Sequence, residues 1–307
     1  KKDFYVNKPN KITVWDNNYV VWKDPKGNYI ALDDACPHRG ASLSCGKIIN
    51  ENIMCPYHGY EFNKKGVLEK VPGISYSPKE KSCVYNVNKY DIVEKNGWVY
   101  LNTMINNNKY EENIYIEEDA FNNTEVVNLD MNFEAYSRLV SENSLDVMHI
   151  AYVHTFGNAN NPNPTKEIPP KEVGKFHYKS VYKYLSGSQS MAKVLFKIDD
   201  IIIENEFILP HTTIARVYFG DYVSTVVTFA LPIGFNKTKL FIKTYRNFWR
   251  NSFGDMISEY LMYKTVSQDK SVVENIDMRY KEGKFNMKFD KLQNSYKTFY
   301  KKFIKDI

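Results

Sequence analysis

Four metal-binding side chains stand in two short runs in the first third of the chain. Cys36 and His38 form a Cys-x-His run, and Cys55 and His58 form a Cys-x-x-His run. Two thiolates and two imidazoles can hold zinc, because Cys2His2 is a common structural zinc set. Zinc fingers usually pair Cys with Cys and His with His, however, whereas each run here carries one of each. The mixed pattern favours a [2Fe-2S] cluster in which two Cys bind one iron and two His bind the other.

A second set of polar residues lies near the middle of the chain, in the pattern N-x-x-D-x-x-H-x-x-x-x-H (Asn143, Asp146, His149 and His154). A lone His is usually a packing residue, but two His with an Asp at this spacing, downstream of the first Cys/His set, are candidates for a second metal site. On an ideal helix the two His would lie about 140° apart. We therefore expect the helix to break or bulge between them. Asp146 and His149 are three residues apart and are expected on one helix face.

A carboxylate must complete this second site if it holds iron. The arrangement for Fe(II) oxygen chemistry is two His and one carboxylate, with open positions. The candidate acids lie on a long helix predicted over 255–280: Asp255, Glu259, Asp269, Glu274 and Asp277. We choose Asp269, because it lies on the apolar face, where a carboxylate needs a strong partner. Glu274 is spaced i,i+4 from Lys270, which satisfies it at the surface. The alternative for Asp269 is a buried acid that caps local backbone.

The elements that position these residues fall into two domains. Residues 1–104 alternate short β-rich runs with turns and predict a small all-β domain. Residues 105–307 form the second domain, which begins with a linker to 124 and contains a predicted loop over 157–170 that borders the substrate entrance. Its alternating segments predict one antiparallel sheet, followed by helices (173–185, 192–203, 212–218, 224–231 and 239–248; helices 255–280 and 289–307). The predicted class is α+β, with a helix-grip catalytic domain.

Composition excludes several classes of function. The chain has 307 residues and a net charge of +5, and it lacks an arginine-rich run, so nucleic acid binding is not expected. It has no run of about 18 apolar residues, so no membrane span is expected. Cys45 and Cys83 are interpreted as unpaired packing residues in a reducing compartment, and the predicted localisation is cytoplasmic. No NAD- or flavin-binding fingerprint is visible.

Both motifs resemble those of one family, the Rieske non-haem iron oxygenases. Around the first set, Pro37, Gly40, Pro56 and Gly59 fit the Rieske motif, and the segment S-Q-D-K-S-V-V-E-N-I that contains Asp269 resembles the third-ligand region. The resemblance implies the following sites: Cys36, His38, Cys55 and His58 hold the [2Fe-2S] cluster; His149, His154 and Asp269 hold mononuclear Fe(II); Asn143 and Asp146 are catalytic. It also implies that Asp146 bridges a catalytic His to a Rieske His of the adjacent subunit.

The same resemblance implies the partners and the reaction. A separate NAD(P)H-dependent reductase or ferredoxin supplies electrons to a homotrimer, which acts on O2 and a small-molecule substrate. The chain resembles the vanillate demethylase, phenylpropionate dioxygenase and pheophorbide oxygenase relatives. We therefore expect hydroxylation or demethylation of a small, hydrophobic, aromatic or cyclic compound. The alternatives are cis-dihydroxylation of an aromatic ring, and a Rieske electron carrier whose second domain binds a ligand without catalysis.

Overall fold

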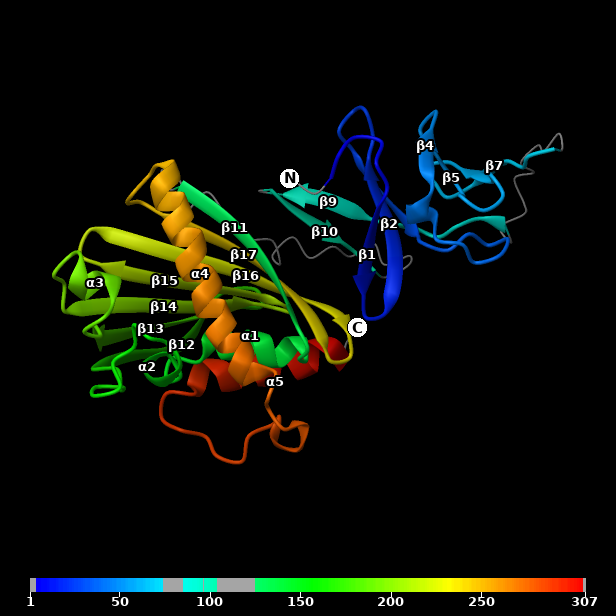
Figure 1. Cartoon of the computed structure of the whole chain (residues 1–307). Helices are drawn as coiled ribbons and strands as arrows, with labels where there is room; N and C mark the ends of the chain where they lie inside the picture. Colours follow the sequence, from blue (N-terminus) through cyan, green and yellow to red (C-terminus); the bar gives the residue numbers. More distant parts are fainter. Residues whose placement is uncertain (1–3, 74–84, 96, 104–124, 306–307) are drawn as a thin grey trace. The chain divides into compact units, whose positions relative to one another are not determined.

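The computed structural model describes residues 4–73, 85–95, 97–103 and 125–305. The chain divides into two compact units between Glu111 and Glu112 (Figure 1). This point lies in the predicted linker, all of which is outside the described residues, as is Cys83. The domain boundary predicted at residue 104 therefore stays a prediction, and the two units are described separately.

The first unit consists of short antiparallel strands. They form the sheets β1-β2-β3-β8, β4-β5-β6-β7 and β9-β10 among the described residues (β1 Asn10–Val14, β2 Asn17–Lys23, β3 Tyr29–Asp33, β4 Lys47–Ile49, β5 Asn52–Met54, β6 Glu61–Phe62, β7 Leu68–Lys70, β8 Lys89–Tyr90, β9 Ile92–Lys95, β10 Trp98–Leu101). β2 is buried on both faces: Val20 and Trp22 enter one apolar cluster, and Tyr19 and Val21 enter another. This explains why its apolar run does not alternate with polar residues.

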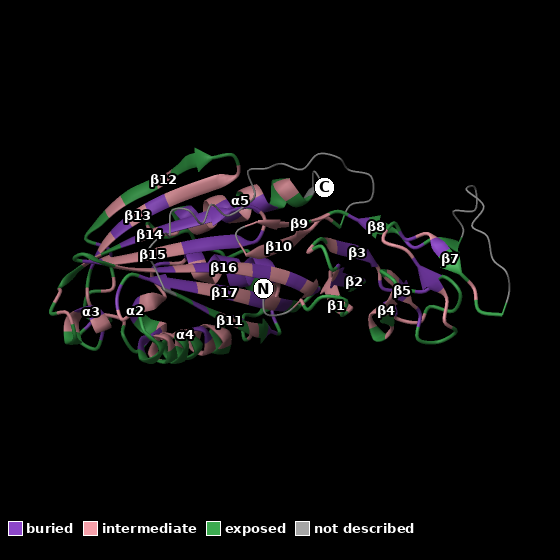
Figure 2. Cartoon of the chain, turned by 90° about the horizontal axis from the view of Figure 1, so that it is seen from above, coloured by how far each residue is buried: buried purple, intermediate pink, exposed green. Residues whose placement is uncertain are grey.

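The second unit is built on one seven-stranded antiparallel sheet of order β11-β17-β16-β15-β14-β13-β12. Its strands are β11 Glu125–Phe133, β12 Lys166–Gly174, β13 His177–Leu185, β14 Asp200–Ile208, β15 Thr212–Phe219, β16 Tyr222–Gly234 and β17 Lys237–Arg246. Inward and outward residues alternate along the long strands (Figure 2), as expected for a sheet with one covered face. The single antiparallel sheet predicted from the sequence is confirmed.

Helices cover one face of this sheet (Figure 1). They are α1 Ser137–Leu145, α2 Ile150–Val153, α3 Met191–Val194, α4 Ser252–Val273 and α5 Lys291–Lys305, with a short 3-10 turn at Met278–Tyr280; another 3-10 turn, Leu43–Cys45, lies in the first unit. α1 and α4 pack on β11, β16 and β17, and α5 packs on β13 and β14 through Leu292 and Tyr296. None of the described helices is long and apolar enough to cross a membrane.

Several predicted elements differ from the structure. The segment predicted as a strand over 192–203 begins with α3, because Ser190 caps a helical turn by accepting the Lys193 N–H at 3.2 Å. The helix predicted over 255–280 spans Ser252–Val273, where Asn251 caps its start. Within the β-rich runs predicted for residues 1–104, residues 85–87 form no strand, and β8 follows at Lys89–Tyr90.

The end of the predicted loop 157–170 is also part of the sheet. From Lys166 the chain pairs with β13 as edge strand β12, and the Ser180 hydroxyl donates to the Ile168 carbonyl at 2.7 Å. The register shifts between Ile168 and Lys171, where Pro169 and Pro170 have no N–H to donate. The prolines that indicated a loop therefore mark an irregular sheet edge.

Candidate metal centres

The two Cys/His runs of the first unit form loops with the same backbone hydrogen bonds. In each, the Cys N–H donates to a carbonyl five residues later, and the Gly four residues after the Cys donates back to the Cys carbonyl, at 2.8–3.1 Å (Cys36 with Ala41 and Gly40; Cys55 with Tyr60 and Gly59). Both glycines have φ of 72°, which disfavours other residues. The paired loops therefore present one Cys and one His each to a common centre.

The Cys and the His of these loops differ in their exposure to solvent. Cys36 and Cys55 are buried, whereas His38 and His58 are exposed with their ring centroids 4.6 Å apart. Burial, together with the neighbouring Cys55 thiol, raises the pKa of Cys36 to about 11, although the backbone N–H groups of His38 and Arg39 lower it by donating to the sulfur. Two close, buried thiols, of which Cys36 receives backbone N–H groups, suit an inner iron, and the exposed His suit an outer one.

Other residues near this centre have simpler roles. Tyr60 stacks on the His38 ring at a centroid distance of 4.7 Å, and Tyr57 lies against the His58 ring at 3.8 Å. Cys45 ends the 3-10 turn Leu43–Cys45 and is exposed, so its predicted role as a packing residue is wrong. The turn faces solvent at that residue, while Leu43 fills the core.

Three residues from two distant parts of the second unit converge on one point. His149 Nε2 lies 3.2 Å from His154 Nε2, and Asp269 Oδ1 lies 3.2 and 3.4 Å from these two nitrogens. His149 and His154 flank α2, whereas Asp269 lies on α4. Among the described His, Cys, Asp and Glu residues, these form the group whose ligand atoms are close enough to share one metal ion.

The other ring nitrogens fix which atoms face the centre. His149 Nδ1 lies 3.0 Å from the backbone carbonyl of Asp146, and His154 Nδ1 lies 3.1 Å from Gln268 Oε1. A carbonyl oxygen only accepts, so each Nδ1 carries the proton and each Nε2 keeps its lone pair. Partners of this kind orient metal-binding His in proteins.

One carboxylate oxygen of this centre lacks a hydrogen-bond donor among the described residues, and this favours binding of a cation. Asp269 Oδ1 is buried and accepts no hydrogen bond within the described part of the chain. When both rings are neutral, the two Nε2 atoms beside it have no proton to offer, so three electron-rich atoms face one another. Such an arrangement is unfavourable unless a cation lies between them. Two His and one carboxylate form the donor set that holds non-haem Fe(II), so the residues fit this metal.

The pKa values of the two His move in opposite directions. Burial is the largest single influence and lowers the pKa of His149, but Asp269 and Asp146 together outweigh it, and the net pKa is raised. Burial also lowers the pKa of His154, and here it prevails over Asp269. His149 therefore holds a proton more readily than His154 when no metal balances Asp269.

The backbone around Asp146 corrects one expectation. α1 ends at Leu145 and Asp146 is extended, with φ −71° and ψ 128°, so Asp146 does not lie on one helix face with His149. The main break thus precedes His149. α2 itself spans only Ile150–Val153, and the chain leaves the helix at His154, which is extended, so the break predicted between the two His is also present. The Asp146 carboxylate does not accept the His149 ring proton. Its Oδ1 accepts the Met148 N–H at 2.7 Å.

Asn143 lies in the last turn of α1 and is half-buried. Its backbone carbonyl accepts the Asp146 N–H at 3.2 Å. Among the described residues, Asp146 Oδ2 accepts no hydrogen bond, and this half-buried carboxylate remains available to a further donor. The catalytic roles predicted for Asn143 and Asp146 stay predictions.

Sequence reasoning missed two residues that hold His154. Gln268 accepts its ring proton, and Phe156 stacks on its ring at a centroid distance of 4.9 Å and an interplanar angle of 17°. In the sequence, the position of Gln268 directly before Asp269 could have indicated that it lies near the metal centre. The other two described His belong to neither metal centre. His177 pairs with Glu206 at 2.6 Å, and burial lowers the pKa of His211 to about 3.

Comparison with known families assigns both units. Residues 1–90 match the Rieske [2Fe-2S] domain. Residues 133–306, more than half of the chain, match the vanillate O-demethylase oxygenase C-terminal domain. The first matched region contains the Cys/His loops of the first unit, and the second contains His149, His154 and Asp269.

Curated relatives are similar over parts of their length. The chain is 26% identical over 269 residues to a chloroplastic pheophorbide a oxygenase of Oryza sativa subsp. japonica, which covers 80% of this chain and 47% of that one. It is 30% identical over 152 residues to the putative toluene-4-sulfonate monooxygenase system iron-sulfur subunit of Comamonas testosteroni, covering 48% and 42%. The chain thus spans less than half the length of these relatives.

Solved structures share the fold. Dicamba monooxygenase bound to 3,6-dichlorosalicylic acid superposes with a TM-score of 0.79 at 21% identity, covering 97% of this chain and 93% of that one. NdmA of Pseudomonas putida CBB5 with caffeine gives a TM-score of 0.79 at 20% identity, covering 96% and 84%. At this identity the likeness establishes the architecture.

Proposed function

This chain belongs to the Rieske oxygenases, with the C-terminal domain of the vanillate O-demethylase oxygenase family, and from that premise we propose that it is the oxygenase component of a multi-protein system. Its first unit takes electrons through the Rieske cluster. Its second unit uses O2 at a mononuclear Fe(II) site to hydroxylate or demethylate a small, hydrophobic, cyclic substrate.

One observation carries the proposal: the two Nε2 atoms and Asp269 Oδ1 converge within 3.4 Å, and no described residue donates a hydrogen bond to that oxygen. Iron bound there supplies oxygen activation. The protein's own residues then have distinct tasks. His149, His154 and Asp269 hold the metal; the Asp146 carbonyl and Gln268 set the ring tautomers; Cys36, His38, Cys55 and His58 hold the cluster.

The substrate class follows from the relatives. Their names state oxygenation of pheophorbide a, toluene-4-sulfonate and 3-ketosteroids, all of which are cyclic. We assign a cyclic, largely apolar substrate to this chain on that ground. Monooxygenation with demethylation is preferred because the C-terminal match is to a demethylase family.

The electron donor is a separate NAD(P)H-dependent reductase or ferredoxin. Two relatives are named as iron-sulfur subunits of monooxygenase systems, which supports a divided arrangement. Asp146 is assigned the bridge to a Rieske His of a neighbouring subunit in a homotrimer, because its Oδ2 atom remains available. An exposed apolar stripe on α4 supports burial by a second copy (Phe253, Met256, Tyr260 and Tyr263).

Iron content tests the proposal. After anaerobic reconstitution the wild type should bind about three irons per chain, two in the cluster and one mononuclear. Asp269→Ala should lose the mononuclear iron and keep the cluster spectrum. Glu274→Gln is the matched control, because Glu274 instead accepts the Glu134 N–H at 2.6 Å.

The same material gives the decisive activity measurement. With a surrogate reductase and a panel of cyclic methyl ethers, the wild type should consume O2 and release demethylated product, and Asp269→Ala should not. About two irons per chain in the wild type, with no turnover, would assign an electron carrier instead. Loss of iron in Glu274→Gln with retention in Asp269→Ala would reverse the ligand assignment.

A further inference from the structure

The loop between α4 and α5 exposes apolar side chains that the oxygenase chemistry does not use. Phe285 is 84% exposed, Met287 69% and Tyr280 50%. Single exposed apolar residues are common, but adjacent ones on a loop tip mark an interaction surface. Tyr280 and Phe285 also border one open hollow of about 210 Å³, so they lie on the same side of the loop. We call residues 279–288 the apolar tip loop.

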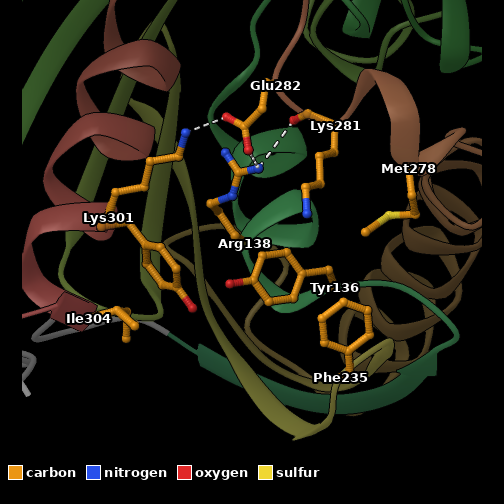
Figure 3. A pocket seen from close by; sticks show the side chains of 9 residues that line it. Tyr136, Arg138, Phe235, Met278, Lys281, Glu282, Lys301 and Ile304 are labelled. Atoms are coloured by element: carbon orange, nitrogen blue, oxygen red, sulfur yellow. Dashed lines mark hydrogen bonds and ion pairs between the residues drawn. The ribbon is translucent and has the colours of Figure 1, made fainter.

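The root of this loop is fixed while its tip is exposed. The buried Arg138 guanidinium donates to the Lys281 carbonyl at 3.2 Å and to Glu282 at 3.0 Å. From α5, Lys301 donates to the Glu282 carboxylate at 2.5 Å and Lys297 to its backbone carbonyl at 2.7 Å. Figure 3 shows Glu282 between Lys301 and Arg138. A tip held at its root keeps its apolar side chains presented to an external partner.

Cations surround the apolar residues of the tip. Between residues 279 and 288 the chain carries Arg279, Lys281, Lys284 and Lys288 against one carboxylate, Glu282. Glu282 is already paired, and Arg279 is paired with the neighbouring Asp277, so Lys284 and Lys288 supply the positive charge at the tip. Lys284 and Lys288 directly flank the segment Phe285-Asn286-Met287 and are exposed. The tip is therefore both apolar and net positive.

We propose that the apolar tip loop docks this protein on an anionic lipid surface. Phe285 and Met287 would enter the boundary between head groups and acyl chains, and Lys284 and Lys288 would contact lipid phosphates or carboxylates. A lipid surface fits better than a protein partner, because protein interfaces are depleted in Lys at their centre. Two exposed apolar side chains on a loop can also insert into a fluid lipid layer, because such a layer does not have to offer a complementary groove.

Vesicle binding by the full, iron-loaded chain tests this inference. The wild type should sediment with phosphatidylcholine vesicles that contain about one third phosphatidylserine, and not with phosphatidylcholine alone. Phe285→Ser/Met287→Ser and Lys284→Glu/Lys288→Glu should each weaken this binding by about tenfold or more, since each lysine near such a surface contributes about fivefold. The matched control is Leu195→Ser/Lys197→Glu, which removes an exposed apolar and a cationic residue near α3 and should bind like the wild type.

Three results would overturn the proposal. The first is a wild type that does not bind the anionic vesicles, and the second is equal loss of binding in the control variant. The third is a change of oligomeric state by light scattering in the loop variants, which would assign the tip to contact between copies. Visible spectra and thermal unfolding should match the wild type in every variant, so that lost binding is not lost folding.

Discussion

At the residue scale, His154 is held differently from His149. Two consecutive residues of α4 bracket the His154 ring: Asp269 Oδ1 lies 3.4 Å from Nε2, and Gln268 Oε1 lies 3.1 Å from Nδ1. The corresponding contact of His149 is to a backbone carbonyl, which substitution does not remove. The tautomer of His154 therefore depends on one side chain.

We expect Gln268→Leu to weaken binding of the mononuclear iron by about 10- to 100-fold, because the His154 ring loses the acceptor for its Nδ1 proton. The Rieske absorption should not change. Iron affinity measured by chelator competition checks this. Ser267→Ala is the control, since the Ser267 hydroxyl donates to the Tyr263 carbonyl within α4. Unchanged iron affinity in Gln268→Leu would show that His154 needs no such partner.

Asp146→Asn distinguishes two roles of Asp146: a bridge to a Rieske His of a neighbouring subunit, and a local role in the turn before His149. An Asn Oδ1 can still accept the Met148 N–H that Asp146 accepts at 2.7 Å, so the turn before His149 should be retained. We expect both metal centres to be present and external reduction of the cluster to be normal. Single-turnover oxidation of the pre-reduced cluster, on mixing with substrate and O2, should be slow. A wild-type rate would exclude the bridge.

At the scale of elements, the segment after His154 is fixed by a close approach of two glycines. A Cβ on Gly187 would lie 2.3 Å from the Gly157 carbonyl oxygen and 2.4 Å from that of Phe156. Gly157 in turn donates its N–H to the His154 carbonyl at 2.9 Å. The connection between β13 and α3 therefore supports the chain that leaves the metal centre.

Gly187→Ala should displace this support, because both clashing atoms are backbone. We expect a lower melting temperature and weaker mononuclear iron binding, while the Rieske spectrum stays intact. Gly174→Ala is the matched control: a Cβ there meets only the His177 side chain, at 3.6 Å or more. Calorimetry with and without iron measures both effects. Equal behaviour of the two variants would contradict the supporting role.

At the scale of the whole molecule, the buried Arg138 side chain joins the helical layer to the α4–α5 connection. Arg138 donates to Glu142 at 2.6 Å within α1, and also to Glu282. Burial raises the pKa of Glu142 to about 7, against the opposing charge of Arg138. The folded protein therefore keeps a proton on Glu142 over a pH range in which the unfolded chain has released it.

Because the folded protein holds this proton more tightly than the unfolded chain does, the free energy of unfolding depends on pH. A raised carboxyl pKa means that the free energy of unfolding falls as the pH rises from about 4.5 to about 7, by up to about 3 kcal/mol. Glu142→Gln cannot titrate, so the difference between wild type and variant should show this fall. Urea unfolding at several pH values measures it. A difference that does not vary with pH would place the Glu142 pKa near its ordinary value.

The sequence by itself determined the chemistry of the two centres and their order, because each motif is local. The spacing within Cys36–His58 forms two loops through hydrogen bonds that span five residues. Alternating apolar residues predicted the sheet in the same way, since strand periodicity needs no distant partner. The apolar face of α4 likewise selected Asp269 before its neighbours in space were known.

Only the tertiary structure decided what those residues meet. The register of the seven strands and the packing of α4 bring Asp269 to two His more than a hundred residues earlier, and the same packing makes Gln268 a partner of His154. The break before His149 depends on Asp146 capping the next turn, and the loop with Phe285 is exposed because Arg138 fixes its root. These are contacts between distant segments, whose free energies no local spacing encodes.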